Sequence, residues 1–411
     1  MAYGYTFAGL MLLWPLLALL GTQGFAPLVG LTGIAALILA RPKWPPALYA
    51  VAFLIFIAWA AASEFWSPAA RQIITGNLME GTFAIGARSL IIVMTALFGV
   101  LTLAAAARTD MSPRAQALIW IAFALHGAIA LASGFISGPF IEAVYGTEPQ
   151  DTVAGIQNVN RNINAFGLVL PLVAAALAHR FGLKGTLAAA VLTALMVVAA
   201  IRVDTQAGVL CVAGMIGGFA LAQVLPRNAY RALFGLAAAY VLFAPAVMMG
   251  LIRSLDGVSR SLPDSFQSRL WSWEAAIGHI REAPLLGHGL GASRTWRETF
   301  AAHPEKLAEL APNWAYYPVI PGHPHNMPLH LWAETGLVGA LLAAAALVLL
   351  AIRLPAPSSL RADVRFAIAG VAGASFSLFS FAYSVWNEAF WAGLALIAAV
   401  LVLFARRAAK G

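Results

Sequence analysis

The sequence has little of what a soluble, disulfide-bonded or ATP-driven protein needs. Only 10% of its 411 residues are charged and 61% are hydrophobic, whereas soluble domains carry about 25% charged residues. A single cysteine, Cys211, lies in an apolar run, so no intrachain disulfide can form. The GxxxxGK[ST] loop that binds nucleotide phosphates is absent, which argues against an ATP-driven pump. This composition predicts a polytopic membrane protein.

Apolar runs that are long enough to cross a bilayer recur along the whole chain. A transmembrane helix needs about 17–25 mostly apolar residues. No Lys or Arg precedes the first run, so it lacks the charged region of a cleavable signal peptide and is predicted to be a retained span. The runs predict an all-α polytopic fold with about 12 transmembrane helices. They lie near residues 5–20, 25–40, 47–63, 83–107, 115–138, 164–179, 185–201, 207–225, 232–252, 326–352, 365–384 and 387–405.

Basic residues are divided unevenly between the two sides of these spans. With the N-terminus inside, the inside segments hold 14 of the 25 basic residues and only two of the 17 acidic residues, Asp110 and Asp363. Short loops rich in Lys and Arg stay on the cytoplasmic side, so both termini are predicted to be cytoplasmic. The inside basic residues are Arg41, Lys43, Arg108, Arg114, Arg180, Lys184, Arg227, Arg231, Arg353, Arg361, Arg365, Arg406, Arg407 and Lys410.

The predicted spans divide the chain into three parts. Residues 1–252 hold nine spans, residues 253–325 form one large outer loop, and residues 326–411 hold the last three spans and a cytoplasmic tail. The net charge of +8 is explained by the orienting loops, so no nucleic-acid partner is predicted. The outer loop is the longest polar segment, and a reactive site is expected there.

The outer loop is predicted to contain an amphipathic helix within residues 261–284. Asp264 or Ser265 is predicted to cap its start, and Pro284 to end it. Its apolar residues recur at helical spacing on one face, which would lie on the membrane surface or on the spans. They are Leu270, Trp273, Ile277 and Ile280.

Two histidines stand where the outer loop returns to the membrane. His323 and His325 flank a proline, and Asn326 is predicted to cap the helix that follows. A neutral imidazole can act as a general base, and its usual pKa of about 6.5 predicts a rate that rises with pH through that range. Because His325 adjoins the rigid helix, it is predicted to be the catalytic base and His323 to be secondary.

Several arginines are predicted to lie near the outer membrane surface. Arg88 begins a span, Arg161 precedes one and Arg202 follows one. An arginine within a span costs roughly 2.5–3.5 kcal/mol on insertion scales, so such residues are commonly paired or functional. Phosphate is a natural planar partner of the guanidinium group, and a diphosphate on a polyprenyl lipid suits several of them. Arg88 and Arg202 are also compatible with side chains that only extend to the polar interface.

Other polar residues of the loop and of the helix after it have structural interpretations. Arg294 and Arg297 are interpreted as solvated loop charges, and His288, between two glycines, as a turn residue. His330 and Glu334 are four residues apart and can hydrogen-bond on one helix face. No metal site is predicted for the HxH pair, because two histidines without a close acidic or cysteine residue are a weak ligand set.

The order and spacing of three motifs resemble the O-antigen ligase and polymerase family of bacterial inner membranes. The motifs are RxxxWxAA at residues 269–276, PLLGHGLG at 284–291 and HNxxLxxWxExGxxG at 325–339. Twelve spans with a large outer loop before the last three fit the ligase branch of this family. The asparagine-rich segment 157–172 is similar to the start of a middle span in the family.

The resemblance implies a metal-independent, inverting glycosyltransferase that uses no cofactor. It implies a glycan donor on undecaprenyl diphosphate, a sugar hydroxyl of the lipid A–core as acceptor, and a periplasmic active site on an inner-membrane protein. His325 matches the family histidine that deprotonates the acceptor, and Arg269 matches the arginine that binds the diphosphate. Arg202, Arg161 and Arg88 are expected to assist diphosphate binding. The expected supporting residues are Asn326, Trp273 and Glu334.

The sequence departs from the family pattern after the seventh span. The family often has Ser-Arg-Ala or Ser-Arg-Gly where this chain has Thr205, Gln206 and Ala207. Either Arg202, four residues before Gln206, supplies the missing cation, or the site uses one cation fewer.

Two other functions stay open at this point. A polymerase that joins O-antigen or exopolysaccharide repeat units on the same lipid would share most of the mechanism. A transporter or lipid flippase belongs to another class and predicts charged residues near the midplane of the spans and repeat symmetry. Here the polar residues lie at the predicted outer edge instead, which favours a glycosyltransferase.

Overall fold

The computed structural model describes residues 1–42, 47–71, 87–255, 257, 261–307, 310 and 312–408. This part of the chain is built of helices, with an isolated bridge between Thr299 and Pro318 and no strand. The all-α polytopic fold predicted from the hydrophobic runs is confirmed.

Ten helices among the described residues are long and apolar enough to cross a membrane. One of them, α9 (Pro149–Arg202), is interrupted at Gly182, whose φ of 55° and ψ of −131° are not helical, so it holds two successive helices. The shorter apolar helix Phe25–Ala40 is a further helical counterpart of a predicted run. Each of the twelve predicted runs therefore has a helical counterpart, although residues 83–86 of one run lie outside the described part.

The remaining helices include the counterparts of the other hydrophobic runs and four helices outside those runs, α5, α8, α12 and α13. In chain order they are α1 (Ala2–Met11), α2 (Trp14–Leu19), α3 (Phe25–Ala35), α4 (Leu48–Ala62), α5 (Pro68–Arg71), α6 (Ala87–Ala106), α7 (Pro113–Phe135), α8 (Ser137–Val144), α10 (Gln206–Val224), α11 (Ala229–Leu255), α12 (Asp264–Glu282), α13 (Pro304–Leu307), α14 (Met327–Arg353), α15 (Ala362–Phe381) and α16 (Glu388–Ala408).

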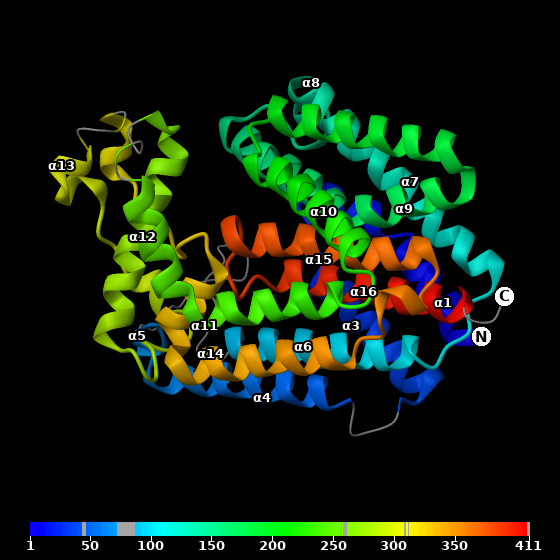
Figure 1. Ribbon diagram of the computed structural model, residues 1–411. Coiled ribbons are helices and arrows are strands. Elements are labelled where there is room, and N and C mark those ends of the chain that lie inside the picture. The colour runs from blue at the N-terminus through cyan, green and yellow to red at the C-terminus, as the bar shows by residue number, and fades with distance from the viewer. Residues whose placement is uncertain are drawn as a thin grey trace.

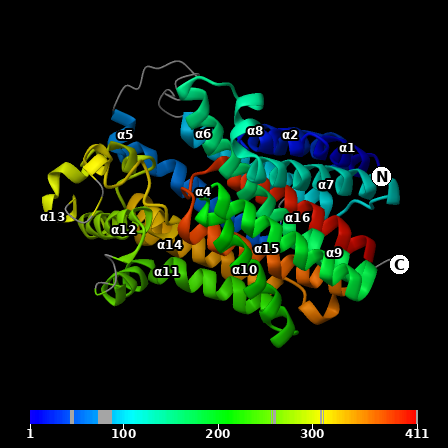
Figure 2. The same ribbon diagram turned by 90° about the horizontal axis from the view of Figure 1, so that it is seen from above.

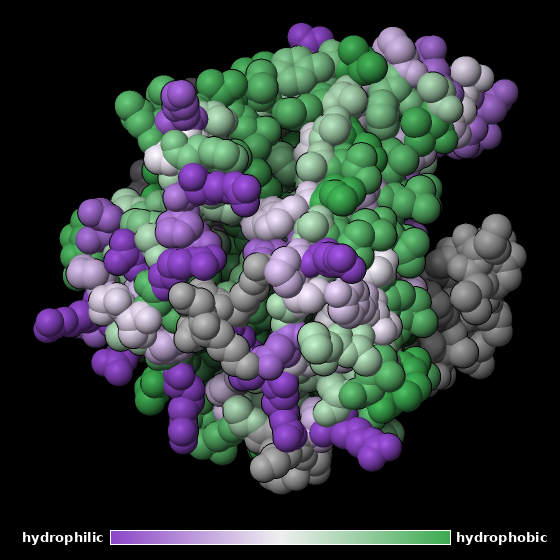
Figure 3. All heavy atoms as spheres, turned by 90° about the vertical axis from the view of Figure 1, so that its right-hand side faces the viewer, coloured by the Kyte–Doolittle hydropathy of each residue, from purple (hydrophilic) through white to green (hydrophobic). Residues whose placement is uncertain are grey.

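The two ends of the helix bundle carry different parts of the chain. α12 and α13 lie at one end, and both termini lie at the opposite end (Figures 1 and 2). Hydrophilic residues are prominent over the end that faces the viewer in Figure 3, which is the side of the termini. Arg406 there donates a 2.6 Å hydrogen bond to the carbonyl of Ala107, which joins the ends of α16 and α6. The predicted outer loop and the termini are thus at opposite ends.

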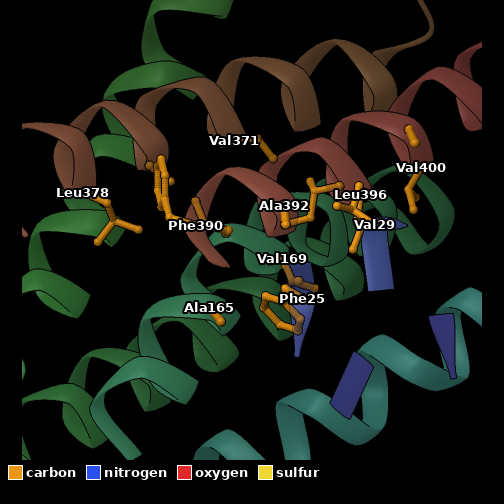
Figure 4. Close-up of a cluster of buried hydrophobic side chains, with 14 of the residues drawn as sticks. Phe25, Val29, Ala165, Val169, Val371, Leu378, Phe390, Ala392, Leu396 and Val400 are labelled. Carbon is orange, nitrogen blue, oxygen red and sulfur yellow. The ribbon is translucent and has the colours of Figure 1, made fainter. Parts of the chain in front are cut away.

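An apolar cluster forms the core of the bundle, and Figure 4 shows part of it, where α3, α9, α15 and α16 meet. Its members include Phe25, Val29, Ala165, Val169, Leu378 and Leu396. α10 and α15 approach each other especially closely, because a Cβ on Gly214 would lie only 2.3 Å from the carbonyl oxygen of Gly373. Small residues allow such contacts, and van der Waals packing then holds membrane helices together.

The polar segment 139–163, which lies between two of the predicted spans, is not a loop. Most of it is helical: it contains α8, and α9 begins at Pro149, well before the apolar run. Proline is favoured in the first turn of a helix because its missing N–H has no partner to lose there. The polar first turns of α9 extend the helix beyond the apolar run that the hydrophobic pattern detects.

The amphipathic helix predicted in the outer loop is present as α12. Its four predicted apolar residues are buried, with Trp273 only 3% exposed, and the helix ends just before Pro284 as predicted. The predicted cap is wrong, because Pro263 is the N-cap and no side-chain cap bond is formed. Asp264 lies instead in the first turn, where a negative charge favours the helix dipole.

Candidate active site

The segment 322–326, here named the histidine turn, is fixed at the start of α14. Asn326 is the N-cap, as predicted, and its Oδ1 accepts a 3.0 Å hydrogen bond from the backbone N–H of Leu329. Its Nδ2 donates to the Tyr240 hydroxyl at 2.6 Å and to the Ser380 carbonyl at 3.1 Å. Since Asn326 is fully buried, these bonds tie the turn firmly to α11 and α15.

His325 has an uncommon backbone conformation within the histidine turn. Its φ is 51°, in the left-handed region that few non-glycine residues adopt, and such strain is held where the surrounding structure enforces it. The Nδ1 atom lies 3.1 Å from the carbonyl oxygen of Ala382, in the connection between α15 and α16. Because a carbonyl only accepts, Nδ1 donates, and the lone pair of the neutral ring is on Nε2.

The imidazole of His325 is neutral at ordinary pH. Burial lowers its pKa to about 4; the hydrogen bond to Ala382 opposes this shift, and the charge of Arg269 adds to it. Nε2 has no hydrogen-bond partner among the residues that the structure describes. The expected pH dependence near 6.5 therefore needs correction for the free protein, since this imidazole is already deprotonated there.

The ring of His323 lies between those of two other histidines. Its ring centroid lies 4.4 Å from that of His325 and 6.1 Å from that of His330. Burial holds the pKa of His323 well below the usual value, and the neighbouring histidines and Arg294 act in the same direction. Arg294 was interpreted as a solvated loop charge; it is exposed, but its charge reaches the histidine turn.

Trp273 positions the proline between the two histidines. Its indole Nε1 donates a 2.8 Å hydrogen bond to the carbonyl oxygen of Pro324. The ring packs with Leu270 and Ile277 against residues of α11 and α14. The buried face of α12 thus sets where the histidine turn lies.

Arg269 lies one helical turn before Trp273 and belongs to the same site. Burial lowers the pKa of Arg269, and the charge of Asp204 opposes this shift. The charge of Arg269 in turn lowers the pKa of His325. Its Nη1 donates to Oε1 of Gln206 at 3.5 Å. Gln206 occupies the position where the family often has an arginine, so the substituted position lies beside Arg269 in space.

Arg161 and Arg88 approach the site from other helices. Arg161 donates to Oδ1 of Asn158 at 3.4 Å, and its charge reaches Tyr383, the residue after Ala382. The Nε of Arg88 is buried and has no hydrogen-bond partner in the described part of the chain. These two arginines flank the connection and the loop that surround the histidine turn.

Arg202 points to a different part of the molecule. Its Nη2 donates a 3.1 Å hydrogen bond to the carbonyl of Phe135, and its guanidinium lies over the ring of the same residue. Phe135 ends α7. The structure therefore joins Gln206, and not Arg202, to Arg269.

Glu334 is a fully buried carboxylate that joins three segments. It accepts hydrogen bonds from the backbone N–H of Gly291 at 2.7 Å, from the hydroxyl of Ser293 at 2.7 Å and from the indole of Trp386 at 2.5 Å. The predicted contact with His330 is also present, at 3.0 Å. The Glu334 carboxylate on α14 thus holds together the PLLGHGLG segment and the connection before α16.

The PLLGHGLG segment docks on a break in α14. Gly336 has a φ of 63°, and Leu337 N–H donates to the carbonyl of Pro284 at 2.9 Å. A Cβ on Gly336 would lie 2.3 Å from the carbonyl oxygen of Leu285, so only glycine fits there. The second and third motifs therefore form one structural unit.

Several contributors to this site carry no sequence signal. The partner of His325 Nδ1 is a backbone carbonyl, that of Ala382, and any residue type would present one. Tyr240 lies far from the motifs in sequence and bonds Asn326 only in the folded chain. Arg269 and Trp273, by contrast, could be predicted from the sequence, because they lie on one helix at regular spacing.

Residues 189–344 match the family model described as O-antigen ligase. This segment is therefore similar to the O-antigen ligase family, whose members are glycosyltransferase-like enzymes. The matched segment contains Arg269, Trp273, the histidine turn and Glu334, whereas Arg88 and Arg161 lie before it. Among curated proteins, none matches the chain.

Proposed function

From the match of residues 189–344 to the O-antigen ligase family model, we propose that this protein is an inverting glycosyltransferase. It moves a glycan from undecaprenyl diphosphate to a sugar hydroxyl of the lipid A–core. The reacting groups are side chains alone, so the reaction uses no metal and no cofactor. Its partners are the two lipid-borne substrates and the surrounding membrane lipids.

The observation that carries this proposal is the pairing of His325 with Arg269. The neutral imidazole of His325, with its available Nε2, lies at the start of α14, and Arg269 on α12 is close enough for its charge to lower the pKa of that imidazole. A glycosyl diphosphate requires both groups: a base for the attacking hydroxyl and a positive charge for the leaving group.

The proposed reaction is a single displacement. Nε2 of His325 takes the proton of the acceptor hydroxyl while the hydroxyl oxygen bonds to the anomeric carbon. The bond from that carbon to the diphosphate oxygen breaks, and Arg269 offsets the charge that develops there. One displacement inverts the anomeric configuration. A positioned general base typically contributes 10²–10⁴-fold to the rate.

The other arginines have graded roles in this proposal. Arg88, whose buried Nε has no partner in the described chain, and Arg161, whose charge reaches Tyr383, extend the cationic surface around the diphosphate. Arg202 would first have to leave the Phe135 carbonyl. Its contribution is therefore expected to be the smallest of the three.

We place the protein in the bacterial inner membrane with both termini cytoplasmic and residues 253–325 periplasmic. The uneven division of basic residues supports this orientation, as does the position of α12 opposite the termini. Reporter fusions at Ala301 and at the C-terminus should report opposite compartments. The same compartment for both would refute the orientation and the periplasmic site.

The lipopolysaccharide of a deletion strain tests the ligase function directly. Loss of a ligase leaves long polymer on the polyprenyl lipid and core without polymer. Loss of a polymerase leaves core that carries one repeat unit. Unchanged banding, together with no transfer by the purified protein from donor lipid to acceptor, would refute both forms of the glycosyltransferase proposal.

A further inference from the structure

Three potential metal ligands converge where α12 ends, away from the histidine turn. His279 and Glu282 lie in the last turn of α12, and His288 lies in the glycine-flanked turn that follows. His279 Nδ1 is 3.1 Å and His288 Nε2 is 3.5 Å from the same oxygen, Glu282 Oε2. Each residue offers one ligand atom, and these atoms all lie within 4.8 Å of one another.

The spacing of these atoms matches the edge length of a tetrahedral metal site. Zinc bonds to imidazole nitrogen and carboxylate oxygen are about 2.0–2.2 Å long, which places neighbouring ligand atoms roughly 3.3–3.6 Å apart in a tetrahedron. The two distances to Glu282 Oε2 already lie near this range. Two of the three pairs of ligand atoms thus already have the spacing that an enclosed ion requires.

The two histidine rings are held by their surroundings. The ring of His279 stacks on the indole of Trp296, with centroids 3.9 Å apart, and His288 meets the same indole edge-on. The backbone N–H of His288 donates to the carbonyl of Ala333 on α14 at 2.9 Å. Rings held by packing on a neighbouring indole lose little freedom when a metal binds.

We propose that His279, Glu282 and His288 bind one divalent transition-metal ion of the zinc type. Two imidazoles and a carboxylate are ligands that zinc accepts, with water in the fourth position. In the metal-free protein His288 Nε2 donates to the carbonyl of His279 at 2.9 Å. On binding, the ring proton moves to Nδ1, and the ring turns so that the lone pair of Nε2 leaves the His279 carbonyl and faces the ion.

The ion would act as a cross-link and not as a reactant. It would join the end of α12, the helix that carries Arg269 and Trp273, to the turn bonded to α14 through Ala333. The reacting groups of the proposed transfer do not include these three ligands. Zinc binding and glycan transfer therefore stand or fall separately.

A nearby histidine provides a matched control. His303 also contacts two carboxylates, Glu298 at 3.0 Å and Glu305 at 3.5 Å. It does so through opposite ring nitrogens, Nε2 and Nδ1, so the two carboxylates cannot share one ion with it. Its side chain is 27% exposed, close to the 26% of His279.

The test is titration of Zn²⁺ into the purified, metal-stripped, full-length protein in detergent, followed by calorimetry. The wild type and His303→Ala should bind one ion per chain with the same Kd. His288→Ala and Glu282→Gln should each weaken binding by about tenfold or more, since even the loss of an outer partner costs 10–100-fold in metal affinity. Zn²⁺ should also raise the Tm of the wild type and not that of Glu282→Gln.

Two results would overturn the proposal. One is a wild type that binds no Zn²⁺ at micromolar concentration. The other is an equal Kd for the wild type, His288→Ala and Glu282→Gln. The Glu282 side chain is 61% exposed, so Glu282→Gln should fold and keep the test informative if His288→Ala does not.

Discussion

The indole Nε1 of Trp273 donates a 2.8 Å hydrogen bond to the carbonyl oxygen of Pro324, the residue between His323 and His325. This bond is buried, and it joins a helix of the large loop to the segment that carries the proposed base. Because Arg269 stands one turn earlier on the same helix, the bond also sets the spacing between the base and the cation.

Trp273→Phe should lower transfer activity while the protein still folds. The variant keeps the ring but leaves the Pro324 carbonyl without its donor, which should cost about 1–3 kcal/mol of stability. A displacement of the base by even about 1 Å can cost 10²-fold in rate. Trp271→Phe is the control, since Trp271 lies on the same helix and packs on Phe300 instead. Equal activity of both variants would show that the bond does not position the site.

His325→Ala should abolish transfer, whereas His323→Ala should lose less. The first variant removes an imidazole whose Nδ1 bonds the Ala382 carbonyl and whose Nε2 is available, and the second removes the neighbouring ring, whose centroid is 4.4 Å away. The loss for His325→Ala should be about 10²–10⁴-fold in kcat, with donor binding nearly unchanged. Both are measured with purified donor lipid and acceptor. If only His323→Ala is inactive, the assignment of the base is wrong.

The pH profile should differ between the free enzyme and its donor complex. Burial lowers the pKa of His325 to about 4, so kcat/KM should fall only as the pH drops towards that value, because protonation removes the base. A bound diphosphate brings negative charge next to the ring and favours the imidazolium. The pKa seen in kcat should therefore be higher than that seen in kcat/KM. Equal values would mean that the diphosphate does not lie near His325.

The lowered pKa of His325 also makes the free energy of unfolding depend on pH. The native pKa of His325 lies below the usual value, so the unfolded chain binds the proton more readily. Its contribution to stability is complete above about pH 6.5 and is lost as the pH falls towards about 4. The difference in Tm between the wild type and His325→Gln should be constant at neutral pH and should change with pH in this acidic window. A pH-independent difference would contradict the burial of the neutral ring.

Arg269→Lys should lose most activity although it keeps the charge. Lysine cannot form the bidentate fork with a phosphate group, and it loses the contact with Gln206. Arg281→Lys, at an exposed position at the end of the same helix, should retain activity. Turnover is measured for both at saturating acceptor over a range of donor concentrations. An Arg269→Lys protein with wild-type turnover would remove the diphosphate role of Arg269.

Much of the fold was predictable because it depends on short stretches of chain. The twelve helical stretches, the buried face of α12 and the Asn326 cap each follow from hydropathy, period or neighbouring residues. Predictions of helix ends were weaker: Pro263, and not Asp264 or Ser265, caps α12, and α9 begins at Pro149, well before the predicted span at 164–179. The ends of a helix depend on local backbone geometry, and the spacing of apolar residues does not predict that geometry.

The sequence by itself determined that this chain is an all-α membrane protein with a loop helix bearing Arg269 and a histidine turn before its tenth apolar run. Only the tertiary structure decided that Nδ1 of His325 binds the carbonyl of Ala382, that Gln206 and not Arg202 meets Arg269, and that Glu334 joins three segments. The physical reason is separation along the chain. Tautomer, burial and pKa are set by atoms that lie dozens of residues away, and these meet only when the helices pack.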